Sequence, residues 1–163
     1  MTATVRLARA HDLRGFLDLA AQVEHWFGPM VREPGFHKAV TQHIEEGKAL
    51  VAETSSQSTG GGGELLGGLL FGAEPSAYHV HWLVVSERIR GHGAGRALMA
   101  EAERRWVRAP GTVEVITFGA DHPGAVTSGA RAFYERLGFT PAEPAEAGPE
   151  GGSRQVFRRE VAG

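Results

Sequence analysis

Two hydrophobic periods divide the chain into helices and strands. Residues 13–23 place apolar side chains three and four positions apart, which predicts an amphipathic helix that stops at residues 27–29. A second stretch, residues 36–46, is expected to be helical and to end at Gly47. The apolar stripe of the first helix consists of Leu13, Phe16, Leu17, Ala20 and Val23.

Shorter apolar runs, several of them rich in β-branched residues, predict strands. They cover residues 4–7, 49–53, 64–71, 78–85, 112–118 and 155–161. The polar, glycine-rich residues 54–63 are expected to form a flexible hairpin tip. A later helix is expected to be capped by Thr127 or Ser128, with a strand starting at Phe139 and a Pro- and Glu-rich loop over residues 141–152.

A strand, a glycine-rich turn and a helix follow one another in the middle of the chain. One face of the predicted strand carries His79, His81, Leu83 and Val85. The turn contains Gly91, Gly93 and Gly95, and the helix after it repeats Leu98 and Ala102 at helical spacing. This order of elements is suited to build an anion site.

The physical basis is the unpaired backbone of the helix start. The first N–H groups of a helix have no intrahelical partner, and the helix dipole adds partial positive charge there. Glycines allow a bulky anion to approach the backbone and permit positive φ angles. Arg90 and Arg96 add charged donors at the two ends of the turn.

Two common phosphate-binding motifs do not fit this turn. A P-loop requires a lysine after its glycines, and none follows here. A dinucleotide fingerprint requires a third glycine where Arg96 stands, and Glu114 lies near the start of the following strand instead of its end. A dinucleotide-dependent oxidoreductase is therefore disfavoured. A tight strand-to-helix turn without a ligand is the remaining alternative.

The turn matches the pattern Q/R-x-x-G-x-G/A, read here as Arg90-Gly91-His92-Gly93-Ala94-Gly95. Together with the strand end before it, it closely resembles the acetyl-CoA-binding motif of the GNAT superfamily of N-acetyltransferases. The resemblance implies acetyl-CoA as cosubstrate. The residues it assigns to acetyl-CoA binding are Leu83, Val84, Val85, Arg90, Gly91, His92, Gly93, Ala94, Gly95 and Arg96.

A second segment, residues 130–139, is similar to the family signature A-x-x-x-Y-x-x-x-G-F. By this resemblance Tyr134 is the general acid that protonates the CoA thiolate as it leaves. A phenol, with an ordinary pKa near ~10, is protonated at neutral pH and comparable to a thiol in acidity. The alternative for Tyr134 is an aromatic side chain that only packs at the helix end.

Transfer to an amine also requires a group that accepts the amine proton. Some family members use a Glu six residues before the position of Val85, and that count falls on His79. Imidazole is a competent base near neutral pH, and His81 lies on the same strand face and is assigned to the acceptor side. A structural role explains His79 equally well. Two histidines are too few for a metal site, so no metal is expected.

The acceptor side is suggested by the aromatic residues where the first two helices meet. In the family this region partly lines the acceptor site, which by resemblance assigns Trp26 and Phe27 to substrate binding. Core packing accounts for the same residues.

Composition narrows the function classes. The chain has 163 residues and no cysteine, which excludes disulfides and a cysteine nucleophile, although a serine route stays open. With 17 basic and 19 acidic residues, its formal charge of -2 argues against nucleic-acid and anionic-membrane binding. No secretion signal or apolar run of ~18 residues occurs, so a cytoplasmic protein is expected.

Residues 1–163 are therefore expected to form a single GNAT domain. Its fold class is α/β (α+β), with a mixed, mostly antiparallel sheet of roughly six to seven strands and about four helices. The expected function is transfer of acetyl from acetyl-CoA to a primary amine of a small molecule or peptide in a ternary complex. A non-catalytic acyl-CoA-binding or regulatory module is the alternative, and the sequence allows a homodimer.

Overall fold

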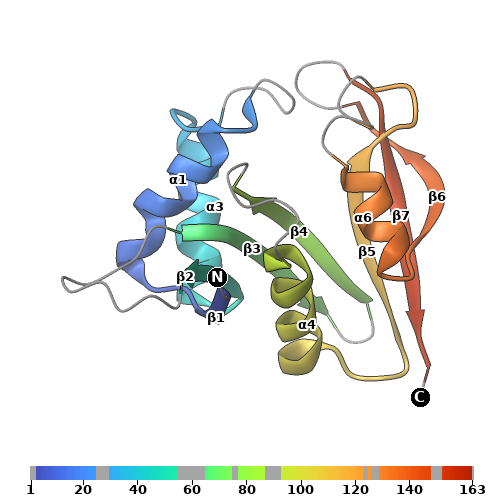
Figure 1. Ribbon diagram of the computed structural model, residues 1–163, viewed down its shortest axis with the longest axis horizontal. Helices are drawn as coiled ribbons and strands as arrows, with labels where there is room; N and C mark the ends of the chain where they lie inside the picture. The colour runs from blue at the N-terminus through green and yellow to red at the C-terminus, as the bar shows by residue number, and fades with distance from the viewer. Residues whose placement is uncertain are drawn as a thin grey trace. The chain divides into compact units, whose positions relative to one another are not determined.

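The computed structural model describes residues 3–24, 30–54, 65–74, 77–86, 93–122, 125, 129–147 and 152–162. In these residues the elements are β1 (Ala3–Leu7), the 3-10 helix η1 (Ala10–Asp12), α1 (Leu13–Ala21), α3 (Pro34–Glu45), β2 (Ala49–Thr54), β3 (Leu65–Glu74), β4 (Ala77–Val85), α4 (Ala94–Trp106), β5 (Gly111–Phe118), α6 (Ala130–Arg136), β6 (Thr140–Ala145) and β7 (Arg154–Val161) (Figure 1).

Seven strands form the sheet, in the order β1-β2-β3-β4-β5-β7-β6. The pairs β1–β2, β2–β3, β5–β7 and β6–β7 are antiparallel, and β4 and β5 are parallel. This confirms the predicted mixed, mostly antiparallel α/β fold. No helix within the described ranges is both long and apolar enough to span a bilayer.

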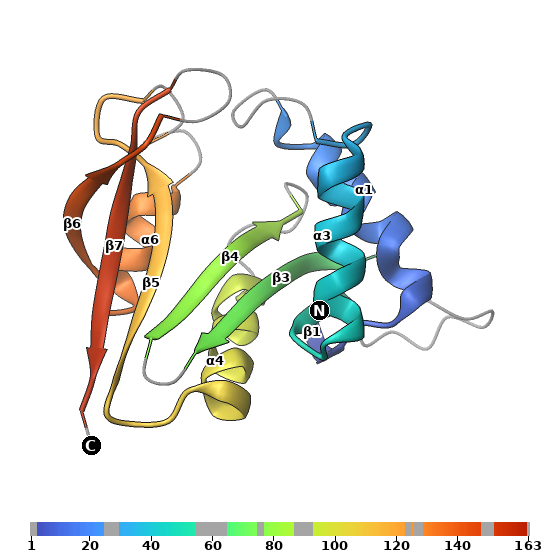
Figure 2. The same ribbon diagram turned by 180° about the vertical axis from the view of Figure 1, so that it is seen from behind.

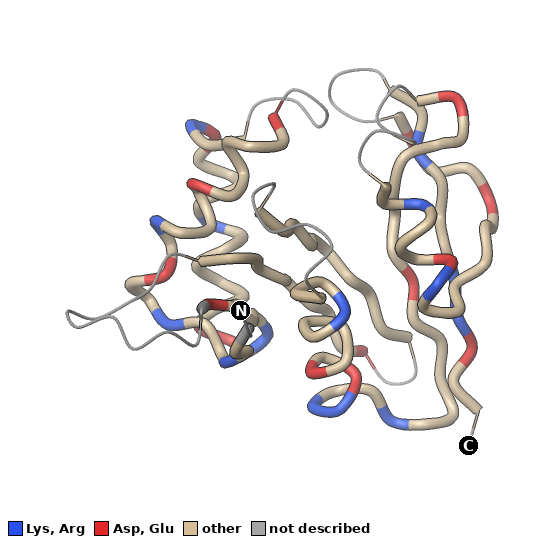
Figure 3. Tube along the Cα trace, viewed as in Figure 1, with Lys and Arg blue, Asp and Glu red and all other residues tan. Residues whose placement is uncertain are grey.

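The chain falls into two compact units, which are described separately. The N-terminal unit comprises Met1–Glu24, Pro29–Phe71 and Trp82–Trp106. The C-terminal unit comprises His25–Gly28, Gly72–His81 and Val107–Gly163. Charges of both signs are interspersed along each unit (Figure 3).

In the N-terminal unit, two adjacent glycines in β3 let helices approach both faces of the strand. A Cβ on Gly68 would lie 2.6 Å from Cε1 of Phe16 in α1. A Cβ on Gly67 would lie 3.0 Å from Cδ1 of Leu98 in α4. Because successive strand residues point to opposite faces, α1 and α4 cover opposite faces of β3 (Figures 1 and 2).

An ion pair fixes the start of the first helices to β1. Arg6 donates from Nη1 to Oδ2 of buried Asp12 at 2.9 Å, and the backbone N–H of Arg9 donates to the same oxygen at 2.7 Å. Burial alone would raise the pKa of Asp12, but the hydrogen bonds from Arg6 and Arg9 outweigh it and lower that pKa. The carboxylate thus stays charged at neutral pH.

In the C-terminal unit, α6 lies against β5 (Figure 1), and Figure 2 shows the opposite face of β5, β7 and β6. The ring of Tyr134 in α6 lies 6.3 Å from that of Phe157 in β7. Phe157 pairs with Val115, and Val115 pairs with Val80 of β4. These side chains therefore share the helix-covered face of the sheet.

The C-terminal unit also contains a strand that runs further than predicted. A strand was expected to start at Phe139, but residues 141–152 were predicted to be a loop because of their prolines, and β6 includes Pro141 and Pro144. The strand lies at the edge of the sheet and pairs only with β7 in the strand order, so a proline there need not donate to a second neighbour. The register with β7 shifts between Pro141 and Pro144, so the pairing is irregular where the prolines lie.

Two helix ends differ from the predictions. Helix α1 ends at Ala21, before residues 27–29, because the N–H groups of Gln22 and Val23 bond three residues back and tighten the last turn. Helix α6 begins after Gly129, whose φ is +71°, instead of being capped by residue 127 or 128, which lie outside the described residues.

The first prediction concerns the glycine pair of β3. Gly68→Ala should lower the free energy of unfolding by about 1–3 kcal/mol, since the new methyl overlaps a fully buried phenylalanine ring. Gly35→Ala in α3 is the control, because no atom lies within 4 Å of its Cβ position, and stability should stay equal or rise. Chemical denaturation compares them, and wild-type stability of Gly68→Ala would contradict the close approach.

Candidate active site

The start of α4, in the N-terminal unit, carries the described part of the glycine-rich turn. Gly93 has φ +83°, and its carbonyl accepts the N–H of Ala97 at 2.9 Å, so it closes the first helical turn. Ala94 and Gly95 are buried and Arg96 is exposed. The remaining assigned turn residues, at positions 90–92, lie outside the described residues.

This helix start has the properties of an anion site. Helix α4 has 13 residues, long enough for its unpaired N–H groups and dipole to act together. The positive φ of Gly93 is accessible to glycine at little cost, and open space surrounds its Cβ position. A cradle with these features fits the phosphates of an acyl-CoA.

Strand β4 ends at Val85, a few residues before this turn in the sequence. Val84 is buried, and the carbonyl of Val84 is 3.1 Å from the Cβ position of Gly67. Leu83 and Val85 are half-buried. The N–H of buried Ser86 donates to the carbonyl of Leu66 at 2.7 Å, which ties the strand end to β3.

An aromatic cluster on β4 was missed by the sequence reasoning. The ring of Trp82 lies 5.8 Å from Phe16 of α1 and 5.6 Å from Phe36 of α3. Its half-buried ring covers the face of β4 that α1 and α3 approach. Trp82 and Val84 are two positions apart, a strand pattern that indicates a shared face of β4, but the pattern does not say which helices pack on that face. The predicted acceptor residues Trp26 and Phe27 lie outside the described residues.

In the C-terminal unit, Tyr134 lies in α6 within an aromatic cluster. Its ring centroid is 5.7 Å from Phe139 in an edge-to-face arrangement, and the residue is 5% exposed. Burial raises the pKa of Tyr134 above its ordinary value. The phenol therefore stays protonated through the neutral range and is able to donate a proton.

His79 belongs to a row of polar side chains across four strands. Its Nδ1 lies 3.7 Å from Oε1 of Glu114 on β5. Arg158 of β7 donates from Nε to Oε2 of Glu114 and from Nη2 to Glu143 of β6, the latter at 2.6 Å. The pairing of Glu114 with His79 was not predicted from the sequence, because only the register of the parallel strands β4 and β5 brings the two residues together.

His81 neighbours His79 on the same strand. The two rings are 6.2 Å apart and nearly parallel, at 17°. A Cβ on Gly72 of β3 would lie 2.5 Å from Cε1 of His81, so this glycine gives the imidazole its space. The described residues contain no cluster of three or more metal-ligating side chains.

Tyr134 and His79 lie on opposite faces of the C-terminal unit's sheet. Val80 and its register partners point toward α6 and Tyr134, so the adjacent residues His79, Glu114 and Arg158 point away from it. The two side chains are therefore not in contact.

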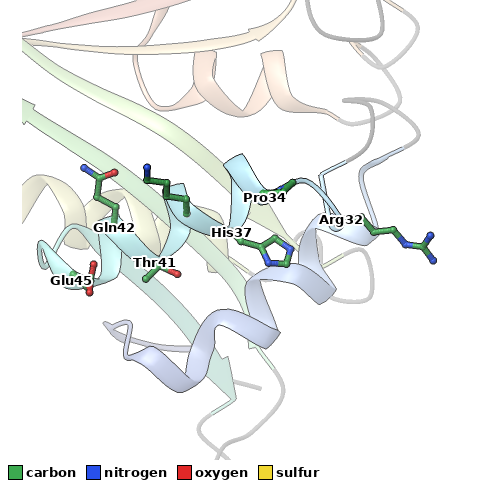
Figure 4. A pocket seen from close by; sticks show the side chains of 7 residues that line it. Arg32, Pro34, His37, Thr41, Gln42 and Glu45 are labelled. Atoms are coloured by element: carbon green, nitrogen blue, oxygen red, sulfur yellow. The ribbon is translucent and has the colours of Figure 1, made fainter.

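A groove of about 780 Å³ runs along α3 and the turn before it (Figure 4). Its lining, mostly exposed to solvent, is Arg32, Pro34, His37, Lys38, Thr41, Gln42 and Glu45. Phe36, which contacts Trp82, is not part of this lining. We therefore do not assign the groove to the candidate active site.

A family model described as an acetyltransferase (GNAT) domain matches residues 45–141, a range that includes the glycine-rich turn and Tyr134. This is more than half of the chain, and the chain therefore belongs to the GNAT acetyltransferase family. The protein is accordingly an acyltransferase. Comparison with curated proteins gave no significant match.

Solved structures of the same fold cover the whole chain. A GNAT-family acetyltransferase from Bacillus cereus ATCC 10987 is 13% identical with a TM-score of 0.72, covering 100% of both chains. Ard1 from Thermoplasma volcanium is 15% identical with a TM-score of 0.73, again over 100% of both. The PaiA N-acetyltransferase from Thermoplasma acidophilum, in complex with coenzyme A, is 13% identical with a TM-score of 0.71, covering 99% of this chain and 100% of that chain. Identities this low show the fold alone.

The second prediction tests the turn. Gly93→Ala forces a non-glycine residue to φ +83° and should weaken coenzyme A binding about tenfold or more, measured by calorimetry. Gly47→Ala is the matched control: it has φ +70° and the same open surroundings but lies at the end of α3. Equal affinity of the two variants would show that Gly93 has no part in binding.

The third prediction concerns the phenol of Tyr134, one of two tyrosines in the chain. In Tyr78→Phe, near-ultraviolet phenolate absorbance should develop only well above pH ~10, because burial disfavours the charged form. The same variant in denaturant should ionise near ~10. Since the unfolded chain ionises first, this group's contribution to stability is present below pH ~10 and is lost as the pH rises further. Ionisation of the folded variant near ~10 would contradict the burial.

Proposed function

We propose that the protein is an N-acetyltransferase that moves the acetyl group of acetyl-CoA to a primary amine of a small molecule or peptide. Transfer is direct, within a ternary complex. The family membership and the neighbour in complex with coenzyme A support an acyl-CoA cosubstrate. The absence of cysteine from the chain removes the commonest covalent acyl carrier.

The observation that carries the proposal is the buried Tyr134 in the family's tyrosine position. Loss of a thiolate leaving group is easier when a proton reaches the sulfur as the carbon–sulfur bond breaks. A phenol carries its proton at neutral pH and can give it to the sulfur, whereas the burial that raises the pKa of Tyr134 disfavours the phenolate left behind. A module that only binds acyl-CoA has no need for such a donor.

The balanced reaction uses two proton transfers. The amine nitrogen attacks the acetyl carbonyl carbon, the new C–N bond forms, and the C–S bond breaks. His79 accepts the proton lost by the nitrogen, directly or through water, and Tyr134 gives its proton to the sulfur. After the transfer the imidazolium gives its proton to water and the phenolate takes one from water, which restores both groups.

The acceptor is proposed to approach from the side of His79 and His81. His79 is half-buried and His81 is exposed, so a peptide amine or a small amine can reach both imidazoles from solvent. Trp26 and Phe27 are proposed to line the acceptor.

The fourth prediction tests the proposed reaction. With acetyl-CoA and a panel of amines, the protein should release free thiol in amounts equal to the N-acetyl product. Tyr134→Phe should lower kcat by roughly 10²- to 10⁴-fold, as expected for loss of a general acid, while calorimetry shows an unchanged affinity for coenzyme A.

Tyr78→Phe is the matched control. It removes the other phenol, which accepts the N–H of Arg108, and should keep kcat near that of the wild type. Wild-type turnover of Tyr134→Phe would remove this residue from the mechanism. Tight coenzyme A binding with no thiol release from any amine would instead favour a non-catalytic acyl-CoA-binding module.

A further inference from the structure

Glu114 faces His79 across the parallel pair of β4 and β5. The two residues are register partners, and Nδ1 of His79 lies 3.7 Å from Oε1 of Glu114. We propose that Glu114 is a positioning residue that orients His79 for proton transfer. The inference rests on the proposed function, in which His79 accepts the proton of the amine.

The contact distinguishes the two ring nitrogens of His79. At 3.7 Å the contact is longer than a hydrogen bond, so Glu114 acts through its charge, which favours the tautomer with hydrogen on the nearer Nδ1 and leaves the lone pair on Nε2 to accept a proton. Once Nε2 is protonated, the ring is a cation beside a carboxylate, and the opposite charges attract. Glu114 thus selects the reactive tautomer and stabilises the imidazolium formed in the transfer.

Arg158 holds Glu114 in this orientation. It bonds Oε2 of Glu114, which leaves Oε1 toward His79, and it also bonds Glu143. The hydrogen bonds that Arg158 donates to Glu143 and then to Glu114 raise the pKa of Arg158, so the guanidinium stays charged throughout. One cation between two carboxylates leaves the row with a single net negative charge, which a proton on His79 neutralises.

The titratable groups that the structure places around His79 come from each packed strand. Glu114 faces it from β5, His81 neighbours it on β4 with rings 6.2 Å apart, and Arg158 stands behind Glu114 on β7. A proton on His81 would repel one on His79, so Glu114 is the neighbour that favours the imidazolium. Glu143 touches Arg158 but does not face His79 in this row, which makes it a matched control.

The first measurement does not depend on catalysis. Nitrogen-15 NMR of the imidazole reports which ring nitrogen of His79 carries hydrogen, with the signals assigned by their loss in His79→Gln. Glu114→Gln, which keeps the size and removes the charge, should lower the share of the tautomer with hydrogen on Nδ1. Glu143→Gln should leave that share unchanged. Should Glu114→Gln fail to fold, Glu114→Asp replaces it and should show a smaller change in the same direction.

The second measurement is the pH dependence of kcat/KM for acetyl transfer. The rate should rise with pH to a plateau, since the amine and its base must both be unprotonated, and Glu114→Gln should lower that plateau several-fold. KM for acetyl-CoA should stay unchanged. In His79→Gln, which should lose about 10²-fold or more, the added Glu114→Gln should have no further effect.

The two measurements separate the failures. Equal changes of the tautomer share in Glu114→Gln and Glu143→Gln, or no change in either, would overturn the positioning role. An additive loss in the double variant would also overturn it. The expected change of the tautomer share in a protein that transfers no acetyl group would leave the pair intact and reject the proposed function instead.

Discussion

The close approach of two helices to one strand is the constraint on which the N-terminal unit depends. Gly67 and Gly68 follow each other in β3, so their missing side chains open space on both faces of the strand. Phe16 uses one space and Leu98 the other, and both are fully buried. Because packed interiors tolerate little overlap, a methyl group at either glycine would push a helix outward.

This packing also sets the start of α4. Leu98 lies one turn beyond Ala94 and Gly95, and its contact at Gly67 fixes how deep that first turn sits against β3 and the end of β4. The N–H of Ser86 bonds the carbonyl of Leu66, just before the glycine pair. The strand end and helix start that frame the turn are therefore anchored to the same short stretch of β3. A cradle for phosphates requires such rigidity, since its donors are backbone groups that no side-chain rotation can re-aim.

The sequence predicted most elements because each has a clear period or a clear stop. Three predictions were confirmed: the buried stripe of the first helix at Phe16 and Ala20, the end of the second helix at Gly47, and the strand that ends at Phe118. The strand expected to start at Phe139 is present as β6, but the loop prediction from residue 141 was wrong because prolines usually end strands, and only the place of β6 at the sheet edge makes Pro141 and Pro144 acceptable.

The candidate site was predictable only where the signal is local. The family motifs pointed to Gly93 and Tyr134 because each motif is continuous in the chain. Glu114 stands 35 positions from His79 in the sequence, and the two meet through a parallel register that no local pattern encodes. The aromatic contacts of Trp82 are long-range for the same reason. Several assigned residues, including Arg90 and Trp26, lie outside the described residues and stay predictions.

The different solvation of the two proposed proton-transfer groups is consistent with their different tasks. Tyr134 must begin each turnover protonated, and a site that is 5% exposed keeps it so, although the same burial disfavours the phenolate left after the transfer. A proton acceptor has the opposite need, because the proton it takes must pass on to water before the next turnover. His79 has a side chain that is 42% exposed, and its partner Glu114 is 26% exposed. Because the two side chains lie on opposite faces of the sheet, they cannot pass a proton to each other directly, so the proton that His79 accepts must leave through water.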